Sequence, residues 1–482
     1  MTVMSLNHNI WSHTIIVSFT TAKYVLIANE QNNSLYSSIN SNNIAYISII
    51  NGNVYKCLKH SKTMNRTELK EVIVDQNNRQ EQENLVDREI FSKVESYIKN
   101  DFVIIISGIR RCGKSTLLSQ IRKKHLGYYL NFDDERLINF KIEDFKVMEE
   151  LFIELYGEKK IFYFDEIQNI SMWERFVRRL HDEKKKVFIT GSNASILSKE
   201  LGTHLTGRHL MFQMYPFSFK EFLHLKKFEL DEKSVYLTAS RAKIKKNFSD
   251  YFINGGFPEY LKELNADYLK TLYENIVYRD ILVRYKIPNE RSLKELVNLA
   301  INNISKEISF NSIKKVLGLG SSTTIKDYFD YLENSFLIFL VPKFDYSLRK
   351  QMYYNKKVYC IDNGLAKYLG FRVTPDNGKL LENIAFIELK RRAKEIYYYS
   401  DKKECDFIIK DGSKITKAIQ CCYELTRDNK EREIAGLTGA MDKFKLKAGL
   451  ILTYDQEEEI ALKGKKKIIV KPVWKWLLEK TE

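Results

Sequence analysis

The chain has 482 residues, of which 44% are hydrophobic and 29% charged, and it carries a formal net charge of +16. This length predicts two to four domains with sizeable cores. The excess of Lys and Arg favours a polyanionic partner, nucleic acid first and an anionic membrane surface second, although a generally lysine-rich proteome would explain the charge as well. No run approaches 18 uninterrupted apolar residues, the start has no basic region ahead of an apolar core, and none of the six Cys forms a C-x-x-C pair. Composition therefore argues against a membrane-spanning, secreted or structural-zinc protein and favours a cytoplasmic one.

Residues 1–63 differ from the rest of the chain in composition. They contain ten Asn and nine Ser but only five charged residues. Two interpretations stay open: a small β-rich or partly disordered extension, or a translated upstream region. We favour the second, with the functional start at Met64, because a charged, helix-like sequence begins there at once.

Beyond this segment the chain has a helical lead-in up to residue 100 and then alternates strands with helices as far as residue 225. Such alternation predicts an α/β fold with a doubly wound parallel sheet and helices on both faces. In such a sheet the ligand binds at the carboxyl ends of the strands. The expected elements are 102–107, 114–125, 127–132, 144–156, 161–165, 173–184, 187–191 and 194–201.

The strongest motif begins at Gly108 and ends at Ser115, and it fits the phosphate-binding pattern G-x-x-x-x-G-K-[ST]. It lies between an expected strand and an expected helix, so that backbone N–H groups of the loop and of the helix N-terminus form an anion site. Lys114 would reach the β- and γ-phosphates of ATP, and Ser115 would be a ligand of Mg²⁺. Arg110 and Arg111 would touch phosphate, or equally face solvent or a neighbouring subunit. The residues predicted to bind nucleotide are Gly108, Ile109, Arg110, Arg111, Cys112, Gly113, Lys114, Ser115 and Thr116.

A second acidic element follows about 50 residues later, where an apolar run from residue 161 ends in Asp165-Glu166. Its pattern is typical of a Walker B strand. Asp165 would hold the Mg²⁺ shell, and Glu166 would orient and polarise the attacking water, which predicts hydrolysis. Alone, the run would equally fit an ordinary strand with an exposed acidic turn, but its place downstream of a phosphate loop favours the catalytic interpretation.

Two more polar positions are candidates for the same site. The strand 187–191 leads into Ser192 and Asn193, either of which could lie near the γ-phosphate and the water as a sensor. Arg208 follows a glycine turn. A cation that reaches the γ-phosphate, often across a subunit interface, stabilises the charge of the transition state, so Arg208 predicts a homo-oligomer. The alternative is a surface arginine.

The middle of the chain is predicted to be helical. Residues 226–300 suggest a lid over the nucleotide. Helices at 310–317 and 322–332, joined by a glycine turn and followed by a strand at 336–341, predict a winged helix over 301–345.

On the second of these helices, Thr323, Thr324 and Lys326 would meet DNA in the major groove. Asp327 and Asp330 on the same helix repel phosphate. A winged helix used for protein contact or internal packing therefore stays open beside the DNA-binding interpretation.

Short segments along the chain form a specific pattern together. They are Gly108–Leu118, Phe164–Gln168 with Trp173, Thr190–Asn193, Leu205–His209, Tyr215–Phe222, Gly255–Glu259, Tyr278–Ile281, Leu381–Asn383, Glu388–Arg392, Cys405–Phe407 and Arg432–Ile434. With them the chain resembles a large family of archaeal and bacterial AAA-type (P-loop) ATPases that carry a C-terminal domain of nuclease-like fold. The resemblance implies an ATPase core over 64–225, a winged helix, and a fold similar to PD-(D/E)xK nucleases over 355–482. It also implies that 1–63 lie outside the family domain.

The nuclease pattern is incomplete. It needs an Asp, then a second acid, then a Lys two residues later, so that two carboxylates hold Mg²⁺ and the Lys positions water. Asp406 matches the first acid, but Gln420 stands at the second and Cys422 at the lysine. Glu388 would supply a carboxylate from a helix without restoring the lysine. The sequence predicts a nuclease-like domain kept for binding or assembly.

The function that these features favour is Mg²⁺-dependent ATP hydrolysis coupled to a DNA- or protein-binding module. The alternatives are an ATP-dependent switch that binds DNA or a protein and hydrolyses slowly, and, less favoured, an ATP-regulated nuclease. No guanine-specific N-K-x-D motif accompanies the loop. The resemblance then favours ATP over GTP.

Overall fold

The computed structural model describes residues 64–78, 85–193, 207–231, 233–370, 376–392 and 394–479, together with the backbone of six strands among the first 57 residues. Those six strands pair in chain order as an antiparallel sheet. They are β1 (Val3–Ser5), β2 (His13–Phe19), β3 (Ala22–Asn29), β4 (Ser34–Ser38), β5 (Ile44–Ile50) and β6 (Asn53–Cys57).

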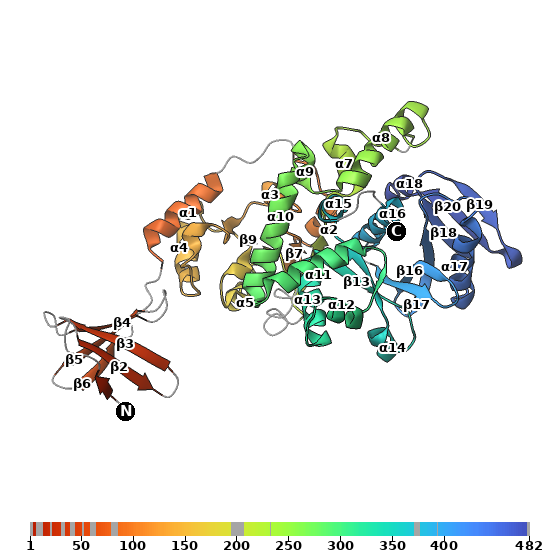
Figure 1. The fold of residues 1–482 in the computed structure, drawn as a ribbon. Coiled ribbons are helices and arrows are strands. Elements are labelled where there is room, and N and C mark those ends of the chain that lie inside the picture. Colours follow the sequence, from red (N-terminus) through yellow and green to blue (C-terminus); the bar gives the residue numbers. More distant parts are fainter. Residues whose placement is uncertain are drawn as a thin grey trace.

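A five-stranded parallel sheet follows, in the order β11-β7-β10-β9-β8 (Figure 1). Every residue of the central strands β7 and β10 is buried, as expected for strands covered on both faces. The doubly wound parallel sheet predicted from the sequence is confirmed. Its strands are β7 (Val103–Gly108), β8 (Tyr128–Asn131), β9 (Ile161–Asp165), β10 (Lys186–Gly191) and β11 (His209–Met214).

Side chains of β7 alternate between two cores, one on each face of this sheet. Ile104 and Ile106 pack with α3, and Val103 and Ile105 pack with α1, α4 and α5. The helix predicted at 194–201 lies outside the described residues. The helical segments of this region are α1 (Arg66–Asn78), α2 (Phe91–Glu95), α3 (Lys114–Lys124), η1 (Glu135–Leu137), α4 (Asp144–Tyr156), η2 (Ile167–Asn169) and α5 (Trp173–Asp182).

Most of the described residues between 219 and 302 lie in helices, as the sequence predicted. Helix α10 continues directly into η3, a stretch of π-helix, and π-helical turns are frequent at functional sites. The elements are α7 (Phe219–Leu225), α8 (Thr238–Asn254), α9 (Pro258–Glu263), α10 (Ala266–Asn275), η3 (Ile276–Val283) and α11 (Glu290–Asn302).

Next come two short helices and a three-stranded antiparallel sheet in the order β12-β14-β13. Ser309 and Ser321 cap the two helices by accepting hydrogen bonds from the N–H groups of Ser312 and Thr323. The predicted helix–turn–helix–strand order is confirmed. The elements are β12 (Glu307–Ile308), α12 (Phe310–Val316), α13 (Ser322–Asn334), β13 (Ile338–Pro342), α14 (Leu348–Tyr353) and β14 (Lys356–Cys360).

The rest of the chain builds a mixed six-stranded sheet in the order β15-β16-β17-β18-β20-β19. Side chains of α16 belong to the core on one face of this sheet, and those of α17 to the core on the other. The elements are α15 (Asn363–Leu369), α16 (Asn377–Arg391), β15 (Glu395–Ser400), β16 (Glu404–Asp411), β17 (Lys414–Cys421), α17 (Lys430–Lys443), β18 (Ala448–Thr453), β19 (Glu458–Ala461), η4 (Lys463–Lys465), β20 (Lys467–Pro472) and α18 (Val473–Leu477).

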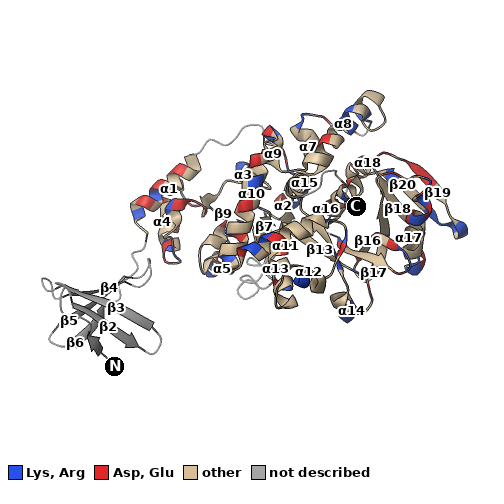
Figure 2. Ribbon diagram, viewed as in Figure 1, with Lys and Arg blue, Asp and Glu red and all other residues tan. Residues whose placement is uncertain are grey.

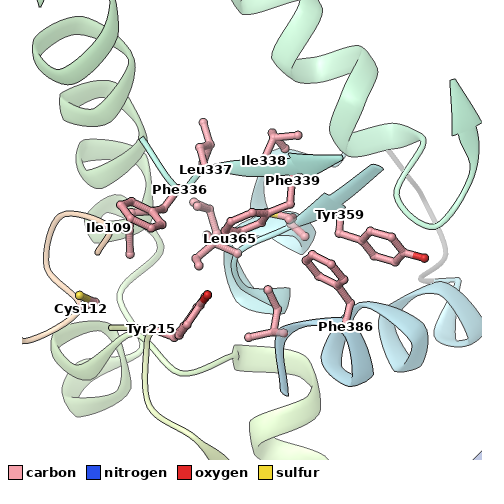
Figure 3. Close-up of a cluster of buried hydrophobic side chains, with 14 of the residues drawn as sticks. Ile109, Cys112, Tyr215, Phe336, Leu337, Ile338, Phe339, Tyr359, Leu365 and Phe386 are labelled. Carbon is pink, nitrogen blue, oxygen red and sulfur yellow. The ribbon is translucent and has the colours of Figure 1, made fainter. Parts of the chain in front are cut away.

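One apolar core runs from the phosphate loop into the C-terminal half. Ile109 of the loop belongs to the same cluster as Tyr215, Phe336 and Phe386 (Figure 3). The rings of Tyr359 and Phe386 stack with their centroids 4.2 Å apart. The parallel sheet and the later elements therefore pack against one another as a continuous interior. In the described segments, no helix combines the length and apolarity needed to cross a bilayer.

Candidate functional site

The loop between β7 and α3 is built on two glycines that tolerate no larger residue. At Gly108 a Cβ atom would lie 2.1 Å from the carbonyl oxygen of Met214 on the neighbouring strand. Gly113 has φ of 100°, in the left-handed region, and a Cβ there would approach Arg88 Nη1 to 2.9 Å. The sequence pattern thus reflects backbone geometry that brings the loop's N–H groups to the start of α3.

A cleft of about 720 Å³ opens in front of this loop. Gly113, Lys114, Ser115 and Thr116 line one part of it, with Asp165 and Glu166 from the end of β9. Its apolar part is lined by Leu85, Val86, Phe217, Leu225 and Pro258. A polar end with backbone N–H groups and an apolar end of this size suit a nucleotide, with phosphates at the loop and the base against the apolar wall.

Lys114 lies buried at the polar end of the cleft. Its Nζ donates hydrogen bonds to the carbonyl oxygens of Gly108 and Ile109 at 3.1 and 3.3 Å and lies 3.3 Å from Glu166 Oε1. Burial is the largest single effect and acts to lower the pKa of Lys114, but the negative groups around it, with Glu166 first and Asp165 among them, together raise that pKa above its usual value. The ammonium is therefore charged and points into the space where phosphate oxygens would lie.

Ser115 and Asp165 form the predicted metal-binding pair. The Ser115 hydroxyl hydrogen-bonds to the Asp165 carboxylate, which also accepts a hydrogen bond from the hydroxyl of Thr190. Burial and the neighbouring Glu166 raise the pKa of Asp165, against these hydrogen bonds. A second cation would relieve this crowding of negative charge, and a hydroxyl beside a carboxylate is a donor set that Mg²⁺ accepts, so the residues present fit this ion.

Glu166 has an unusual backbone conformation for a residue with a side chain. Its φ is 51°, in the left-handed region, and its N–H donates to Thr190 Oγ1 at 3.0 Å. Its Oε2 accepts a hydrogen bond from Gln168 Nε2 at 2.5 Å. Burial alone would raise the pKa of Glu166, but Lys114 and Arg110 hold it below the usual value. The carboxylate is thus ionised, and it lines the cleft beside the Lys114 ammonium.

Arg110 of the loop forms a two-pronged ion pair with Asp280 of the π-helix. Arg110 Nε and Nη2 donate to the two carboxylate oxygens at 3.0 and 3.1 Å, and Asp280 is buried. Ser192 Oγ lies 3.4 Å from the same carboxylate. Burial acts to lower the pKa of Arg110, while hydrogen bonding to Asp280 raises it. The loop is therefore tied to η3 by charge.

Asn193 also points toward this helical segment. It is fully buried just beyond the end of β10, and its Nδ2 donates to the hydroxyl of Tyr285 at 3.0 Å. The structure brings Ser192 and Asn193 to the carboxyl edge of the sheet, where the phosphate loop and Asp165 also lie. Both contact the helical segment through Asp280 and Tyr285.

Arg208 lies at the opposite edge of the sheet. It precedes β11, which runs parallel to β7 with His209 beside Val103 and Met214 beside Gly108. A six-residue strand spans about 20 Å, so Arg208 cannot reach the phosphate loop of its own chain. Its side chain is 41% exposed and pairs with Asp182 at 2.8 Å. Arg208 could therefore act only on a γ-phosphate bound by another copy of the chain.

Three of the predicted loop residues face different surroundings. Ile109 and Cys112 are fully buried in the core, so only their backbone faces the loop, and burial raises the pKa of the Cys112 thiol. Arg111 has φ of 66° and lines the cleft. It belongs on the ligand side of the loop.

Arg88 is a residue of the site that sequence reasoning missed. Its guanidinium is buried and donates to the carbonyl oxygen of Cys112 at 2.5 Å, to that of Tyr215 at 2.7 Å and to Glu221 Oε1 at 2.9 Å. It thus clamps the phosphate loop to the segment after β11. No motif surrounds it, and a lone Arg in a helical, charged stretch carries no signal in one sequence.

A second buried polar cluster lies at the junction of β14, α16 and β16. Lys357 Nζ lies 3.1 Å from Glu382 Oε1, 2.5 Å from Glu404 Oε1 and 2.8 Å from Asp406 Oδ1. Tyr359 donates its hydroxyl to Glu382 at 2.6 Å. Burial, together with the charge of Asp406, raises the pKa of Glu382.

This cluster corrects the sequence analysis in one respect. Glu388, expected beside Asp406, instead pairs with Arg391 and Arg392, and Glu382 one and a half helical turns earlier takes the place near Asp406. The side-chain oxygen of Gln420, on the neighbouring strand β17, accepts from the N–H of Asp406 at 3.2 Å.

The cluster also holds its own cation. Cys422 bonds through its thiol to the carbonyl of Glu424, away from the carboxylates. Lys357 therefore supplies the positive charge of the cluster, from a strand outside the C-terminal sheet. Among the described residues, no group of three or more His, Cys, Asp or Glu side chains is arranged to hold a metal ion.

Comparison with known proteins gives two family matches along the chain. Residues 100–223 match the model of an AAA domain, and residues 245–376 match a domain of unknown function (DUF8612). An uncharacterised protein of Methanocaldococcus jannaschii is 36% identical over 429 residues, which is 85% of this chain and 94% of the relative. An uncharacterised protein of Haemophilus influenzae is 32% identical over 397 residues, 79% of this chain and 95% of the relative.

Solved structures are more distant. The Walker-type ATPase of Pyrococcus abyssi is 17% identical with a TM-score of 0.39, over 60% of this chain and 97% of that one. The ADP form of the ORC2 protein of Aeropyrum pernix is 13% identical with a TM-score of 0.32, over 54% and 90%.

Proposed function

Because this chain belongs to the family of AAA-domain P-loop proteins that includes the relatives from Methanocaldococcus jannaschii and Haemophilus influenzae, we propose that it is a Mg²⁺-dependent ATPase. The observation that carries the proposal is the meeting of Lys114, Ser115, Asp165 and Glu166 in one cleft. The two carboxylates lie at the end of β9, and the Lys114 ammonium and Ser115 hydroxyl lie at the start of α3. Groups of opposite charge therefore meet in the same cleft.

Each of these side chains has a role that its geometry supports. Lys114 binds the β- and γ-phosphates of ATP, and Ser115 with Asp165 holds Mg²⁺, which offsets phosphate charge. Glu166 orients the attacking water and accepts its proton, for which an ionised carboxylate is required. Gly108, Gly113 and Thr116 contribute backbone N–H groups around the phosphates.

Before ATP arrives, Lys114 and Glu166 neutralise each other. Phosphate oxygens compete for the ammonium, so nucleotide binding frees the Glu166 carboxylate for water. The same pair supports the alternative function of a slow switch, in which release of Glu166 is incomplete. The two functions differ in turnover, and binding alone does not separate them.

Arg208 would complete the site from a neighbouring copy of the chain. Its place at the far edge of the parallel sheet supports action across a homo-oligomeric interface, where an arginine stabilises transition-state charge. Asn193 would contact the γ-phosphate of its own chain's nucleotide, and its hydrogen bond to Tyr285 would respond to that contact.

The remaining elements form the module that the ATPase would drive. We assign residues 64–225 to the ATPase core, 226–300 to a helical lid, 301–345 to a winged helix and 355–482 to a nuclease-like domain. The helix–helix–strand order and the three-stranded sheet support the winged helix, which binds DNA or a protein. A nuclease activity is not favoured, because Lys357 occupies the space between Glu382 and Asp406. Free thiols at Cys360, Cys405 and Cys421 suit a cytoplasmic protein.

The test is ATP turnover of the full chain with Mg²⁺. We expect Lys114→Ala to abolish nucleotide binding and turnover, and Glu166→Gln to keep binding while lowering turnover about 10²–10⁴-fold. The matched controls are Lys124→Ala, at the exposed far end of α3, and Glu158→Gln, on the loop before β9, which should both keep the wild-type rate.

Turnover by Lys114→Ala at the wild-type rate would contradict the site. Tight ATP binding by the wild type with no turnover would select the switch instead. Loss of turnover on omission of Mg²⁺, recovered on its return, would support the metal-binding role of Ser115 and Asp165.

A further inference from the structure

An apolar tip projects from the hairpin that joins β13 to β14. The short helix α14 forms this tip, which we define as residues 346–353 and which lies at the lower edge of the right-hand part of Figure 1. Tyr346, Leu348, Met352 and Tyr353 are 77, 74, 73 and 80% exposed. Four large apolar side chains within eight residues, each more than 70% exposed, form a concentrated surface, and such surfaces mark interaction sites.

The tip is held in place by contacts at its base. Phe344 donates its N–H to the carbonyl of Tyr398 at 2.7 Å, and its ring packs edge-on against Phe444 with centroids 5.0 Å apart. Within the turn, Asp345 accepts from the N–H of Ser347 at 2.8 Å, and its carbonyl accepts from Gln351 Nε2 at 2.6 Å. The exposed side chains thus stand on a hydrogen-bonded turn anchored to the C-terminal sheet.

Cations on α14 and on the two helices before it have no ion-pair partner among the described residues. Arg349 and Lys350 lie on α14, Lys314 and Lys315 on α12 and Lys326 on α13 (Figure 2). None of these five forms an ion pair with another described residue, whereas Lys294, Lys357 and Lys379 of neighbouring segments of the chain all do. Cations without carboxylate partners leave a field that attracts an anionic surface.

Two features select duplex DNA over a protein as that surface. Four of the five cations are Lys, which is depleted at protein–protein interfaces, whereas duplex DNA offers a phosphate charge about every 1.7 Å of its length. Leu348 and Met352 are four residues apart, so they lie side by side on one face of α14. Adjacent Leu and Met side chains flanked by cations are the arrangement with which proteins wedge open a base step from the minor groove.

We propose that the tip binds duplex DNA, with Leu348 and Met352 inserted at a base step and Arg349 and Lys350 on the flanking phosphates. The inference deepens the proposed function by naming the partner of its driven module. It moves the main contact away from α13, where the exposed Asp327 directly follows Lys326 and its charge would repel a phosphate. DNA bent by the wedge is then the partner coupled to the ATPase.

The experiment measures binding of the full chain to a fluorescent duplex of about 30 bp by anisotropy over a range of salt, and bending by energy transfer between the duplex ends. Wild type should bind and bend the duplex. Removing two phosphate contacts in R349Q/K350Q should lower the slope of log affinity against log salt by about 2. In L348S/M352S the slope should stay unchanged, while affinity falls about tenfold and the bend is lost.

Two controls keep the outcome interpretable. K463Q/K465Q removes the same charge from the η4 turn beside the last strands and should bind as wild type. L348M/M352L keeps an apolar wedge and should keep the bend. Thermal unfolding of each variant shows that it is folded.

Absence of duplex binding by folded wild type at low salt would overturn the inference and assign the tip to a protein partner. Binding that survives both tip variants would overturn it also. Because DNA binding is measured without ATP, loss of ATP turnover in the wild type would contradict only the proposed ATPase, and loss of DNA binding only the tip.

Discussion

Lys357 brings one positive charge among three carboxylates that all follow it in the chain, Glu382 by 25 residues and Asp406 by 49. The side chain is 2% exposed, and Asp406 in turn accepts the N–H of Cys421 at 2.8 Å. Burying these acids without a cation is far more costly than burying the complete cluster. Lys357 therefore stabilises the junction rather than taking part in chemistry.

We predict that Lys357→Met destabilises the protein by about 3–5 kcal/mol, because Glu382 and Asp406 would remain buried without a counter-charge. Chemical denaturation followed by circular dichroism measures the change. Lys315→Met on the exposed surface of α12 is the matched control and should change stability by less than about 0.5 kcal/mol. A Lys357→Met protein as stable as the control would show that the cluster is solvated in solution.

Single residues also mark where sequence reasoning stopped. The loop from Gly108 to Ser115 was identifiable because its spacing is dictated by backbone geometry within one turn. The carboxylate near Asp406 was assigned to Glu388, and the structure has Glu382, because a helix rotates by about 100° per residue and its facing side depends on packing that one sequence does not reveal. Arg88 acts through three partners more than 20 residues away, so no local pattern points to it.

Among the elements, the strands and helices with long apolar periodicity were predicted to within two residues, as for 144–156 and 161–165. The strand β11 (His209–Met214) was missed. It lies at the edge of the sheet, and its continuous apolar run is short, from Leu210 to Phe212, between the polar His209 and Gln213. The ion pair between loop and π-helix was missed too, since it joins residues 170 positions apart.

That ion pair predicts energetic coupling between the phosphate loop and η3. In a double-mutant cycle of Arg110→Gln and Asp280→Asn, we expect a coupling free energy of about 1–3 kcal/mol in urea unfolding, since Asp280 is buried, Arg110 is half-buried and two hydrogen bonds join them. A control cycle pairs Arg110→Gln with Glu290→Gln, an exposed residue at the start of α11. Additivity within about 0.5 kcal/mol for the first cycle would mean that the pair contributes nothing in solution.

For the whole molecule, the continuous core in Figure 3 means that the nucleotide cleft and the later elements are not independent bodies. A displacement of Ile109 or Asp280 would shift packed side chains that continue to Phe336 and to the hairpin of β13 and β14. The sequence predicted the separate parts and their order. It could not predict this shared interior. An apolar residue that packs against another domain gives the same sequence periodicity as one that packs within its own domain.

The position of Arg208 leads to a prediction for the assembly. Arg208→Ala and Glu166→Gln should each lower ATP turnover by at least about 10²-fold. A 1:1 mixture should recover about a quarter of the wild-type rate if copies associate at random, because one site in four then combines an intact Glu166 with a neighbour's Arg208. Turnover of the mixture is compared with that of each variant alone.

Recovery depends on exchange of copies, which sedimentation of a labelled variant with an unlabelled one shows directly. A mixture that exchanges copies and yet stays inactive would leave Arg208 as a surface residue paired with Asp182.

The burial of Lys357 also limits when its part of the chain can fold during synthesis. When β14 is synthesised, the carboxylates that will receive its ammonium have not yet been made, since Glu382 and Asp406 follow 25 and 49 residues later. A nascent chain that ends between them can close the hairpin only with an unpaired charge inside. A cut near residue 370 would leave Lys357 in the N-terminal fragment and its carboxylate partners in the C-terminal one. The three-stranded sheet that contains β14 and the C-terminal six-stranded sheet therefore fold together. Neither should be expressed without the other.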